Sequence, residues 1–122
     1  MKLKKNKIKV TSRSFSRHPV LKQELLDIFP NSVFNTDGPP TGLPNIVEFL
    51  NDADGIILGL EQMDRQILQQ LKNLKIVAKY GVGLDNLDVE AAKKLGILCK
   101  NSVVGVLEIC NVPTTRPPRK KR

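Results

Sequence analysis

Gly81 and Gly83, two glycines separated by one residue, lie in the part of the sequence best suited to bind an anion. A short apolar run at 76–78 favours a β-strand before them, and Asp88 is a residue type that caps helices after them. Glycines permit positive φ and let bare backbone approach a ligand. In this order of strand, turn and helix, the turn amides and the helix dipole point the same way and favour an anion.

A dinucleotide site is the first interpretation to test, because the two glycines satisfy the first half of G-x-G-x-x-G. The third glycine position, however, holds Asn86. About twenty residues further on, where an acidic residue would hold the ribose, the sequence has Lys100. The nucleotide interpretation is therefore weak, and the two glycines by themselves favour an ordinary strand-to-helix turn of an α/β domain.

The longer run KYGVGLDNLDVEAA, residues 79–92, resembles a segment of the D-isomer-specific 2-hydroxyacid dehydrogenases. That family contains phosphoglycerate, formate and D-lactate dehydrogenases, in which a strand ends in G-V-G-x-D-N-x-D before a helix rich in alanine. The similarity extends backward through GIILGLEQMDRQILQQLKNLKIVAKY, residues 55–80. The resemblance implies that the loop belongs to the substrate domain rather than to the cofactor domain.

The resemblance also implies roles for individual residues of this loop. The backbone amides of Val82 and Gly83 would bind the substrate carboxylate, and Gly81 would shape the loop. Tyr80 and Lys79 complete the expected substrate-binding set. Lys79 falls where phosphoglycerate dehydrogenases often place an arginine for the distal phosphate.

Three further positions qualify the resemblance. Gly59 falls where those enzymes place a second arginine, so phosphate recognition is incomplete and phosphoglycerate is disfavoured as substrate. Asp85 and Asn86 are expected to be structural and to hold the turn through side-chain to backbone hydrogen bonds. We expect no metal ligands, no cofactor-binding residues and no catalytic residues in this chain.

The elements that must position the loop follow from hydrophobic periodicity and from helix caps. A turn is expected at 13–16, and a stiff turn at 37–42. Strands are expected at 7–12, 33–34, 55–58, 76–78 and 97–99. Four helices are expected: from Pro19 to Pro30, after 42, after Asp64, and from Asp88 to Gly96. The residues expected to point inward are Leu21, Leu25, Ile28 and Phe29 in the first helix, Ile46, Phe49 and Leu50 in the second, and Ile67, Leu68 and Leu71 in the third.

This alternation of strand and helix predicts an α/β fold. Right-handed crossovers would give a five-stranded parallel sheet with helices on both faces, a flavodoxin-like three-layer sandwich in the strand order 2-1-3-4-5. The resemblance implies the same fold. Ligands of such sheets gather at the carboxyl ends of the strands, so the turns at 13–14, 59–61 and 80–83 should converge there.

The net charge of +8 is concentrated at the two ends of the chain. Between Val10 and Thr115, ten Lys or Arg residues face twelve Asp or Glu residues, so the body is mildly acidic. Terminal basic runs are usually solvated, and we do not expect nucleic-acid binding. No segment is apolar enough to cross a membrane or to act as a signal peptide, and we expect a cytoplasmic protein.

The remaining residues with reactive side chains favour structural roles. His18 has no acidic neighbour in the sequence to orient it, so capping or surface exposure is favoured over acid–base catalysis. Cys99 and Cys110 are too few and wrongly spaced for a zinc site, and both are expected to be reduced, with Cys99 in the core.

These observations lead to one functional hypothesis. Residues 1–100 would form the substrate-binding domain of an NAD-dependent D-2-hydroxyacid dehydrogenase, and 101–122 a degraded linker with a basic, disordered tail. The nucleotide-binding domain of that family, with its catalytic arginine, glutamate and histidine, has no counterpart in this truncated chain. We therefore expect it to bind a small 2-hydroxy or 2-oxo acid, not to bind NAD, and to be inactive without that domain in trans.

An alternative from another class stays open. The same fold could serve as a non-catalytic interaction module with a basic tail. Faces that the missing domain would cover would then expose apolar surface, which favours homo-oligomers.

Overall fold

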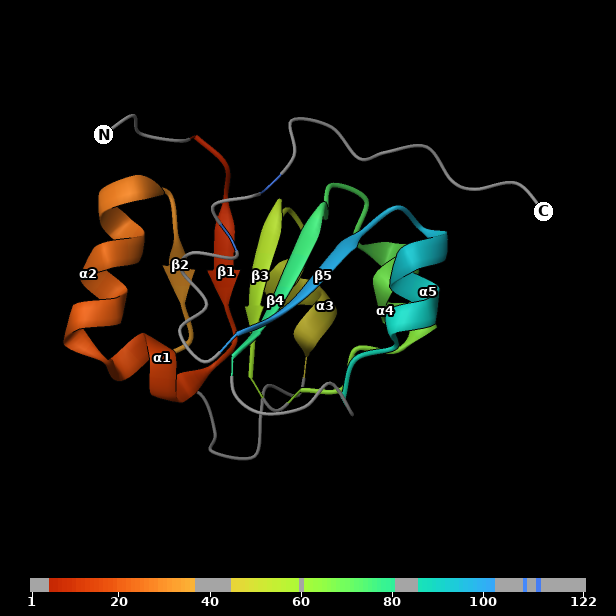
Figure 1. Cartoon of the computed structure of the whole chain (residues 1–122), viewed down its shortest axis with the longest axis horizontal. Helices are drawn as coiled ribbons and strands as arrows, with labels where there is room; N and C mark the ends of the chain where they lie inside the picture. Colours follow the sequence, from red (N-terminus) through yellow and green to blue (C-terminus); the bar gives the residue numbers. More distant parts are fainter. Residues whose placement is uncertain are drawn as a thin grey trace.

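Five parallel strands form one sheet in the order β2-β1-β3-β4-β5 (Figure 1). The structure is a computed structural model and describes residues 5–36, 45–59, 61–80, 86–102, 109 and 112. Strand pairs are parallel throughout, for example Ile56 opposite Val77 and Ala78 opposite Lys100. This is the predicted flavodoxin-like order. The strands are β1 (Ile8–Val10), β2 (Val33–Phe34), β3 (Gly55–Leu58), β4 (Ile76–Tyr80) and β5 (Leu98–Ser102).

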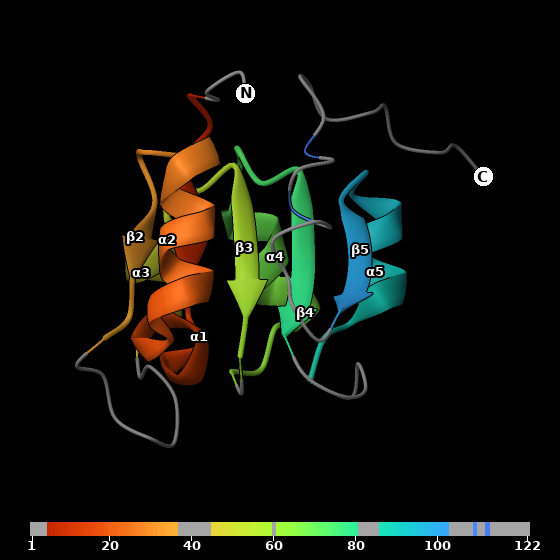
Figure 2. The ribbon, with the colours of Figure 1, turned by 60° about the vertical axis from the view of Figure 1, so that its left-hand side comes forward.

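Helices cover both faces of the sheet (Figures 1 and 2). α1 and α2 lie on one face, and α3, α4 and α5 lie on the other. None of the helices within the described ranges is long and apolar enough to span a membrane. The helices are α1 (Arg13–Arg17), α2 (Pro19–Ile28), α3 (Ile46–Leu50), α4 (Arg65–Gln70) and α5 (Val89–Lys94).

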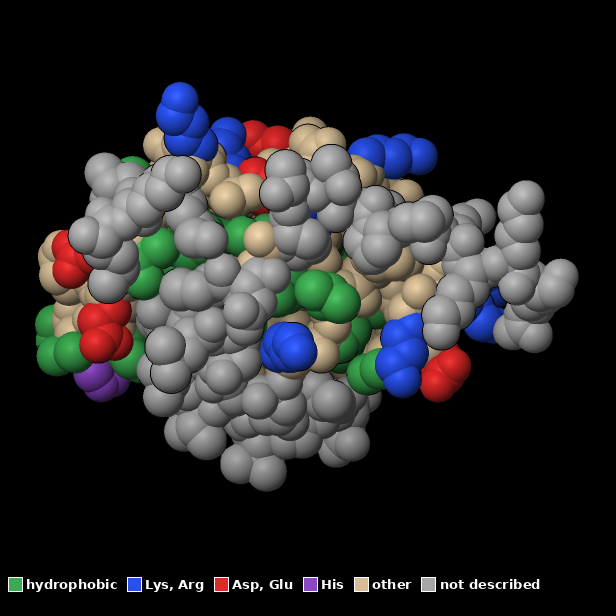
Figure 3. Space-filling view, turned by 45° about the horizontal axis from the view of Figure 1, so that its top comes forward, with side chains coloured by type: hydrophobic (Ala, Val, Ile, Leu, Met, Phe, Trp, Pro, Cys, Tyr) green, Lys and Arg blue, Asp and Glu red, His purple; other side chains and the backbone are tan. Residues whose placement is uncertain are grey.

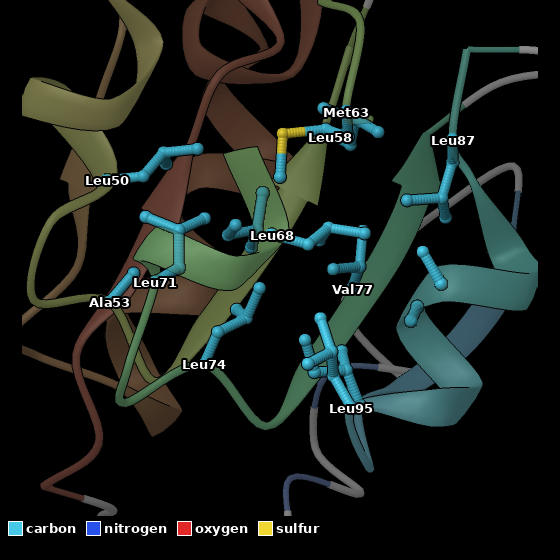
Figure 4. Packing of buried hydrophobic residues seen from close by; sticks show 14 of the residues in the cluster. Leu50, Ala53, Leu58, Met63, Leu68, Leu71, Leu74, Val77, Leu87 and Leu95 are labelled. Carbon is cyan, nitrogen blue, oxygen red and sulfur yellow. The ribbon is translucent and has the colours of Figure 1, made fainter. Parts of the chain in front are cut away.

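Each face of the sheet has its own hydrophobic core, because successive side chains of a strand point to opposite faces. Ile56 and Leu58 of β3 point toward α3–α5, whereas Ile57 points toward α1 and α2. Figure 4 shows how leucines from the connections and helices fill the first of these cores. β3 is buried on both faces, as its apolar sequence predicts.

Side-chain caps define where the helices begin. Asp64 and Asp88 accept hydrogen bonds from the amides of Ile67 and Ala91, each at 3.0 Å, as predicted. His18 caps α2, since its Nδ1 accepts from the Leu21 amide at 3.2 Å. Gly96 follows α5 with φ 78°, the left-handed conformation expected of a C-terminal glycine.

The prediction of a turn at residues 13–16 is wrong, because these residues begin helix α1. Ser12 caps it by accepting from the Phe15 amide at 3.1 Å, and the Ser16 amide donates to the Ser12 carbonyl at 3.0 Å. Phe15 is fully buried and anchors the helix to the core. A helix of five residues stabilised by a cap and one buried ring shows no periodicity in the sequence.

Strand limits also differ from the predictions. β4 continues two residues beyond Ala78 to Tyr80, and β5 runs from Leu98 to Ser102 rather than from Ile97 to Cys99. The partners Lys79–Asn101 and Tyr80–Ser102 explain both extensions, because polar residues here complete the backbone ladder. The turn expected at 37–42 lies outside the described residues.

Residues beyond β5 also contribute to the core. Ile109 is fully buried, and a Cβ added to Gly55 would lie 3.0 Å from its Cδ1. The Val112 amide donates to the Ile109 carbonyl at 3.1 Å. The division at residue 100 remains a prediction, but at least one side chain after it packs on the sheet.

Candidate functional site

The carboxyl ends of β1, β3 and β4 meet at one edge of the sheet, the lower edge in Figure 1. Thr11 and Arg13 follow β1, Gly59 follows β3, and Tyr80 ends β4. Parallel sheets bind ligands at this edge, where loops and helix N-termini gather. The edge is therefore the place to look for a site, as the sequence predicted.

Thr11 joins the ends of β1 and β3. Its Oγ1 accepts a hydrogen bond from the Gly59 amide at 2.8 Å, and its own amide donates to the Ile57 carbonyl at 3.0 Å. A Cβ at Gly59 would lie 2.8 Å from the Ser12 Cα, so no larger residue fits without moving backbone. The ends of β1 and β3 therefore lie against one another, and glycine is required at their contact.

Asn86 joins the turn after β3 to the segment that follows β4. Its Nδ2 donates to the carbonyls of Gly59 and Glu61, both at 2.8 Å. Its own carbonyl accepts from the Met63 amide at 2.7 Å. Met63 and Leu87 form a parallel β-bridge alongside. Asn86 therefore has the predicted structural role, whereas Asp85 lies outside the described residues.

Tyr80 connects β4 to helix α1. Its ring lies edge-on to the Phe15 ring, with centroids 5.3 Å apart and planes at 90°. This geometry is favourable for an aromatic pair. Tyr80 is half-buried and packs against the core on the side of α1 and α2.

Lys79 is a buried cation at the same edge. It is only 6% exposed, and its Nζ donates to the Tyr80 carbonyl at 3.3 Å. Within the described residues, no carboxylate forms an ion pair with it. A buried ammonium without a counter-charge is costly, because the interior solvates charge poorly.

Arg13 adds a second basic group after β1. Its Nε is buried and has no hydrogen-bond partner among the residues described. Sequence analysis placed Arg13 at this edge but assigned it no role. Among the described residues, Lys79 has one hydrogen bond, to the Tyr80 carbonyl, and the Nε of Arg13 has none.

Gly81, Val82 and Gly83, the predicted carboxylate-binding residues, lie outside the described residues. The structure describes the two residues that flank residues 81–85, hereafter the amide loop. Tyr80 is the end of β4 at the carboxyl edge, and Asn86 is bonded to the turn after β3. The role of the loop amides remains a prediction.

A dinucleotide does not fit the start of helix α5. The carboxylate of Asp88 already accepts the Ala91 amide at 3.0 Å, and Glu90 lies in the first turn. These two negative charges would repel a pyrophosphate. Asn86, at the third fingerprint position, uses its side chain to bond protein carbonyls.

Other reactive groups have structural surroundings. His18 is used as a cap, and burial raises the pKa of the Cys99 thiol, an effect that the nearby Lys93 partly opposes. Cys99 packs against the α3–α5 core, as predicted. No group of three or more His, Cys, Asp or Glu residues in the described part of the chain could hold a metal ion.

Sequence reasoning missed two buried polar residues of this edge. Thr11 is the partner of Gly59, and Asn35 donates through Nδ2 to the Thr11 carbonyl at 2.9 Å. Thr11 is the first residue after β1, in which Ile8 and Val10 are buried, and Asn35 is the first residue after β2, which is not buried. A polar residue immediately after a buried strand is a signal that could have identified Thr11 but not Asn35.

Comparison with known proteins gives one consistent family. Residues 4–105 match the D-isomer specific 2-hydroxyacid dehydrogenase family, catalytic domain. A glyoxylate reductase of Thermococcus litoralis is 37% identical over 65 residues, which cover 52% of this chain and 19% of that protein. A D-3-phosphoglycerate dehydrogenase of Methanocaldococcus jannaschii is 35% identical over 65 residues, 51% of this chain and 12% of that protein. The aligned part is thus about a fifth or less of these relatives.

Solved structures show the same fold. A protein of Pyrococcus horikoshii OT3 superposes with a TM-score of 0.68 at 21% identity, covering 81% of this chain and 28% of that one. The 3-phosphoglycerate dehydrogenase of Entamoeba histolytica, solved with bound NAD⁺, gives a TM-score of 0.62 at 23% identity, covering 80% and 33%. The five-stranded parallel domain therefore corresponds to about a third of these longer chains.

Proposed function

The chain belongs to the D-isomer specific 2-hydroxyacid dehydrogenase family, and we propose that it binds the substrate of such an NAD-dependent enzyme. The ligand would be a small 2-oxo or 2-hydroxy acid. Its carboxylate would accept hydrogen bonds from the amides of Val82 and Gly83, with Gly81 shaping the loop. Lys79 and Tyr80 would complete the site.

The positions of the two residues that flank the amide loop are the observation that supports this proposal. Tyr80, which precedes the loop, is the carboxyl end of β4, and Asn86, which follows it, is bonded to the turn after β3. Both flanking residues therefore lie at the edge at which parallel sheets bind ligands. Oriented backbone amides at such an edge suit a carboxylate, since each N–H is a donor to the charged oxygens.

Lys79 supports the same proposal through charge. Its buried ammonium has no ion-pair partner in the described part of the chain. A bound acid would supply the missing negative charge. Because a charge-assisted hydrogen bond is stronger than a neutral one, Lys79 would contribute both affinity and orientation.

Gly59 supports the choice of a small, unphosphorylated acid. A side chain at this position would collide with the backbone of Ser12. The second basic residue expected of a phosphoglycerate site therefore does not fit there. Glyoxylate, for which one of the relatives is named, has no distal phosphate to bind.

Hydride transfer also requires a nicotinamide cofactor held against the substrate. The residues at the start of α5 do not fit a dinucleotide, as described above, so we assign them no part in binding it. In this proposal the chain holds and orients the acid, and a separate nucleotide-binding region, in cis or in trans, would hold NAD, which supplies the hydride acceptor. We expect no NADH binding by these residues.

Titration followed by amide NMR tests the proposal. Glyoxylate and D-lactate should shift the amide signals of Lys79, Val82 and Gly83, and acetate, which lacks the 2-oxygen, should do so more weakly. NADH should cause no shift. Absence of any response to the acids would contradict the proposal and favour the non-catalytic interaction module.

A matched pair of lysine variants separates the site from general charge. Lys79→Gln should weaken acid binding about tenfold, the loss of one charge-assisted hydrogen bond. Lys93→Gln removes an equal charge from the exposed surface of α5 and should leave the affinity within about twofold. Equal effects of the two variants would mean that the acid binds non-specifically.

A further inference from the structure

Gly55 leaves a gap on the face of the sheet to which α1 and α2 belong. It is paired with Ile8 of β1 and with Ile76 of β4, so the three residues form a row across the amino ends of the central strands. Ile8, Ile57 and Ile76 all belong to the core on this face. Because residues two apart on a strand share a face, the side chain that Gly55 lacks would point into the same core. The row therefore has an aliphatic side chain at each end and none in the middle.

Ile109, which comes after the last strand, fills this gap. A Cβ added to Gly55 would lie 3.0 Å from the Cδ1 of Ile109. The same Cβ would lie 2.9 Å from the Cδ1 of Ile8 and 3.1 Å from the Cγ2 of Ile76. All three isoleucine side chains are fully buried. Three methyl groups thus meet over the backbone of Gly55, and we call the site formed by Ile8, Gly55 and Ile76 the Gly55 socket.

The segment after β5 covers a part of this face that the two helices do not. In Figure 2, α1 and α2 lie over β1 and β2, and no helix of the described residues lies in front of β3 and β4. Ile57, Ile76 and Ala78 of these two strands are nonetheless fully buried on this face. Ile109 and the half-buried Val112 pack in the same core, and the Val112 amide donates to the Ile109 carbonyl at 3.1 Å.

We propose that the Gly55 socket is an interaction surface for one aliphatic side chain, and that its partner is this chain's own segment at Ile109 and Val112. Ile109 is the anchor of that segment. Glycine is needed at position 55 because any Cβ would occupy the space that the anchor's Cδ1 takes, and closely packed interiors leave no room for both. The folded unit accordingly extends at least to Val112, beyond the boundary predicted at residue 100. This inference does not depend on the proposed acid binding.

Transfer of one methyl group between the two partners tests the socket. Gly55→Ala adds a methyl group at the contact, and Ile109→Val removes the Cδ1 methyl from it. Each single substitution should lower the Tm of the full chain by about 5 °C, the first through crowding and the second through a small cavity. The double variant restores the packed volume and should melt within about 3 °C of the unaltered chain.

Ile57→Val is the matched control for this cycle. It removes the same methyl group from the same core, but Ile57 is not among the three nearest contacts of a Cβ at Gly55. Combined with Gly55→Ala, its loss should add to a total of about 10 °C. If the losses add in the same way for Gly55→Ala with Ile109→Val, the proposal is overturned, because position 55 and Ile109 would then not share space.

Hydrogen exchange gives a second test that needs no change at Gly55. The Val112 amide, which donates to the Ile109 carbonyl, should exchange at least about tenfold more slowly than a free amide in the unaltered chain. In Ile109→Ala, which lacks most of the anchor, this protection should be lost while the amides of β3 and β4 stay protected. Exchange of the Val112 amide at the free rate in the unaltered chain would overturn the proposal. If Gly55→Ala does not fold, this measurement still decides the matter.

Discussion

The amino and carboxyl edges of the sheet differ in whether their basic side chains form ion pairs. At the amino edge, Lys7 and Lys9 contact the carboxylate of Asp52 at 2.6 and 2.9 Å, and Lys75 contacts that of Asp54 at 2.7 Å. Figure 3, with this edge turned toward the viewer, shows basic and acidic side chains beside one another. At the carboxyl edge, Lys79 and Arg13 have no carboxylate partner within the described residues.

This difference favours the carboxyl edge as the place of the proposed binding site. At the amino edge these acidic and basic groups are paired with one another, and the Lys7 amide also donates to the second oxygen of Asp54 at 2.7 Å. The side-chain hydrogen bonds that link the strand ends at the carboxyl edge join neutral groups, those of Thr11, Asn35 and Asn86 with backbone, although the side chain of Glu61 is also buried at this edge.

Matched glycine substitutions should give the largest contrast between the edges. Gly59→Ala at the carboxyl edge places Cβ 2.8 Å from backbone of Ser12, and we expect a loss of about 2–3 kcal/mol in the free energy of unfolding. Gly55→Ala at the amino edge meets side-chain methyl groups of Ile8, Ile76 and Ile109 at 2.9 to 3.1 Å and no backbone atom among its nearest contacts. Its loss should stay near 1 kcal/mol.

Urea unfolding of the two glycine variants measures this contrast. The slope of the free energy of unfolding against urea concentration should be the same for both variants, so that a difference in midpoint reports a difference in stability. Equal losses would show that the ends of β1 and β3 are no more tightly fixed than the rest of the sheet.

Removal of the Asp54 carboxylate should have the next largest effect. It would leave Lys75, which is mostly buried, without its ion-pair partner and the Lys7 amide without an acceptor. We expect Asp54→Ala to lower the free energy of unfolding by about 2 kcal/mol. Thermal unfolding measures it, and a change within experimental error would mean that the amino edge does not depend on its charges.

The smallest effect should be the acid dependence that comes from Asp52. Hydrogen bonds from Lys7 and then Lys9 hold the pKa of its carboxyl well below its ordinary value of about 3.9. Because the folded pKa is the lower one, the stabilisation is present above pH about 4 and is lost as the pH falls toward the folded pKa. Its size should be below about 1 kcal/mol, since Asp52 is 47% exposed and solvent screens the pair.

The variant Asp52→Asn isolates this contribution. Between about pH 5 and about pH 2, the range in which the Asp52 carboxylate takes up its proton, the free energy of unfolding of this variant should fall less steeply than that of the unaltered chain. Parallel pH profiles for the two proteins would contradict the assignment.

The fold could be predicted from the sequence because its signals are local. Asp64, Asp88 and Gly96 mark helix ends through bonds that span only three or four residues, and the apolar run at Gly55–Leu58 marks a buried strand. The length of β5 could not be predicted in this way. Its last residues are polar and are in a strand because β4 offers backbone partners for them.

The candidate site was predictable only in part. The glycine pair and Lys79 stand out in the sequence, but the contacts that hold the edge join distant residues. Thr11 and Gly59 are 48 positions apart, and Gly59 and Asn86 are 27 apart. Such pairs depend on how the strands are ordered, so no local pattern reveals which polar side chain will meet which backbone group.

The central claim is that the carboxyl edge keeps a buried charge available for an anion, and two lysine variants test it most directly. Thermal unfolding of Lys79→Met should show a gain of about 1 kcal/mol, because an uncompensated buried ammonium is removed, while D-lactate binding is lost. Lys75→Met at the amino edge should instead lose about 1–2 kcal/mol, because Asp54 loses its partner. Equal destabilisation by the two variants, with acid binding unchanged in Lys79→Met, would contradict the claim.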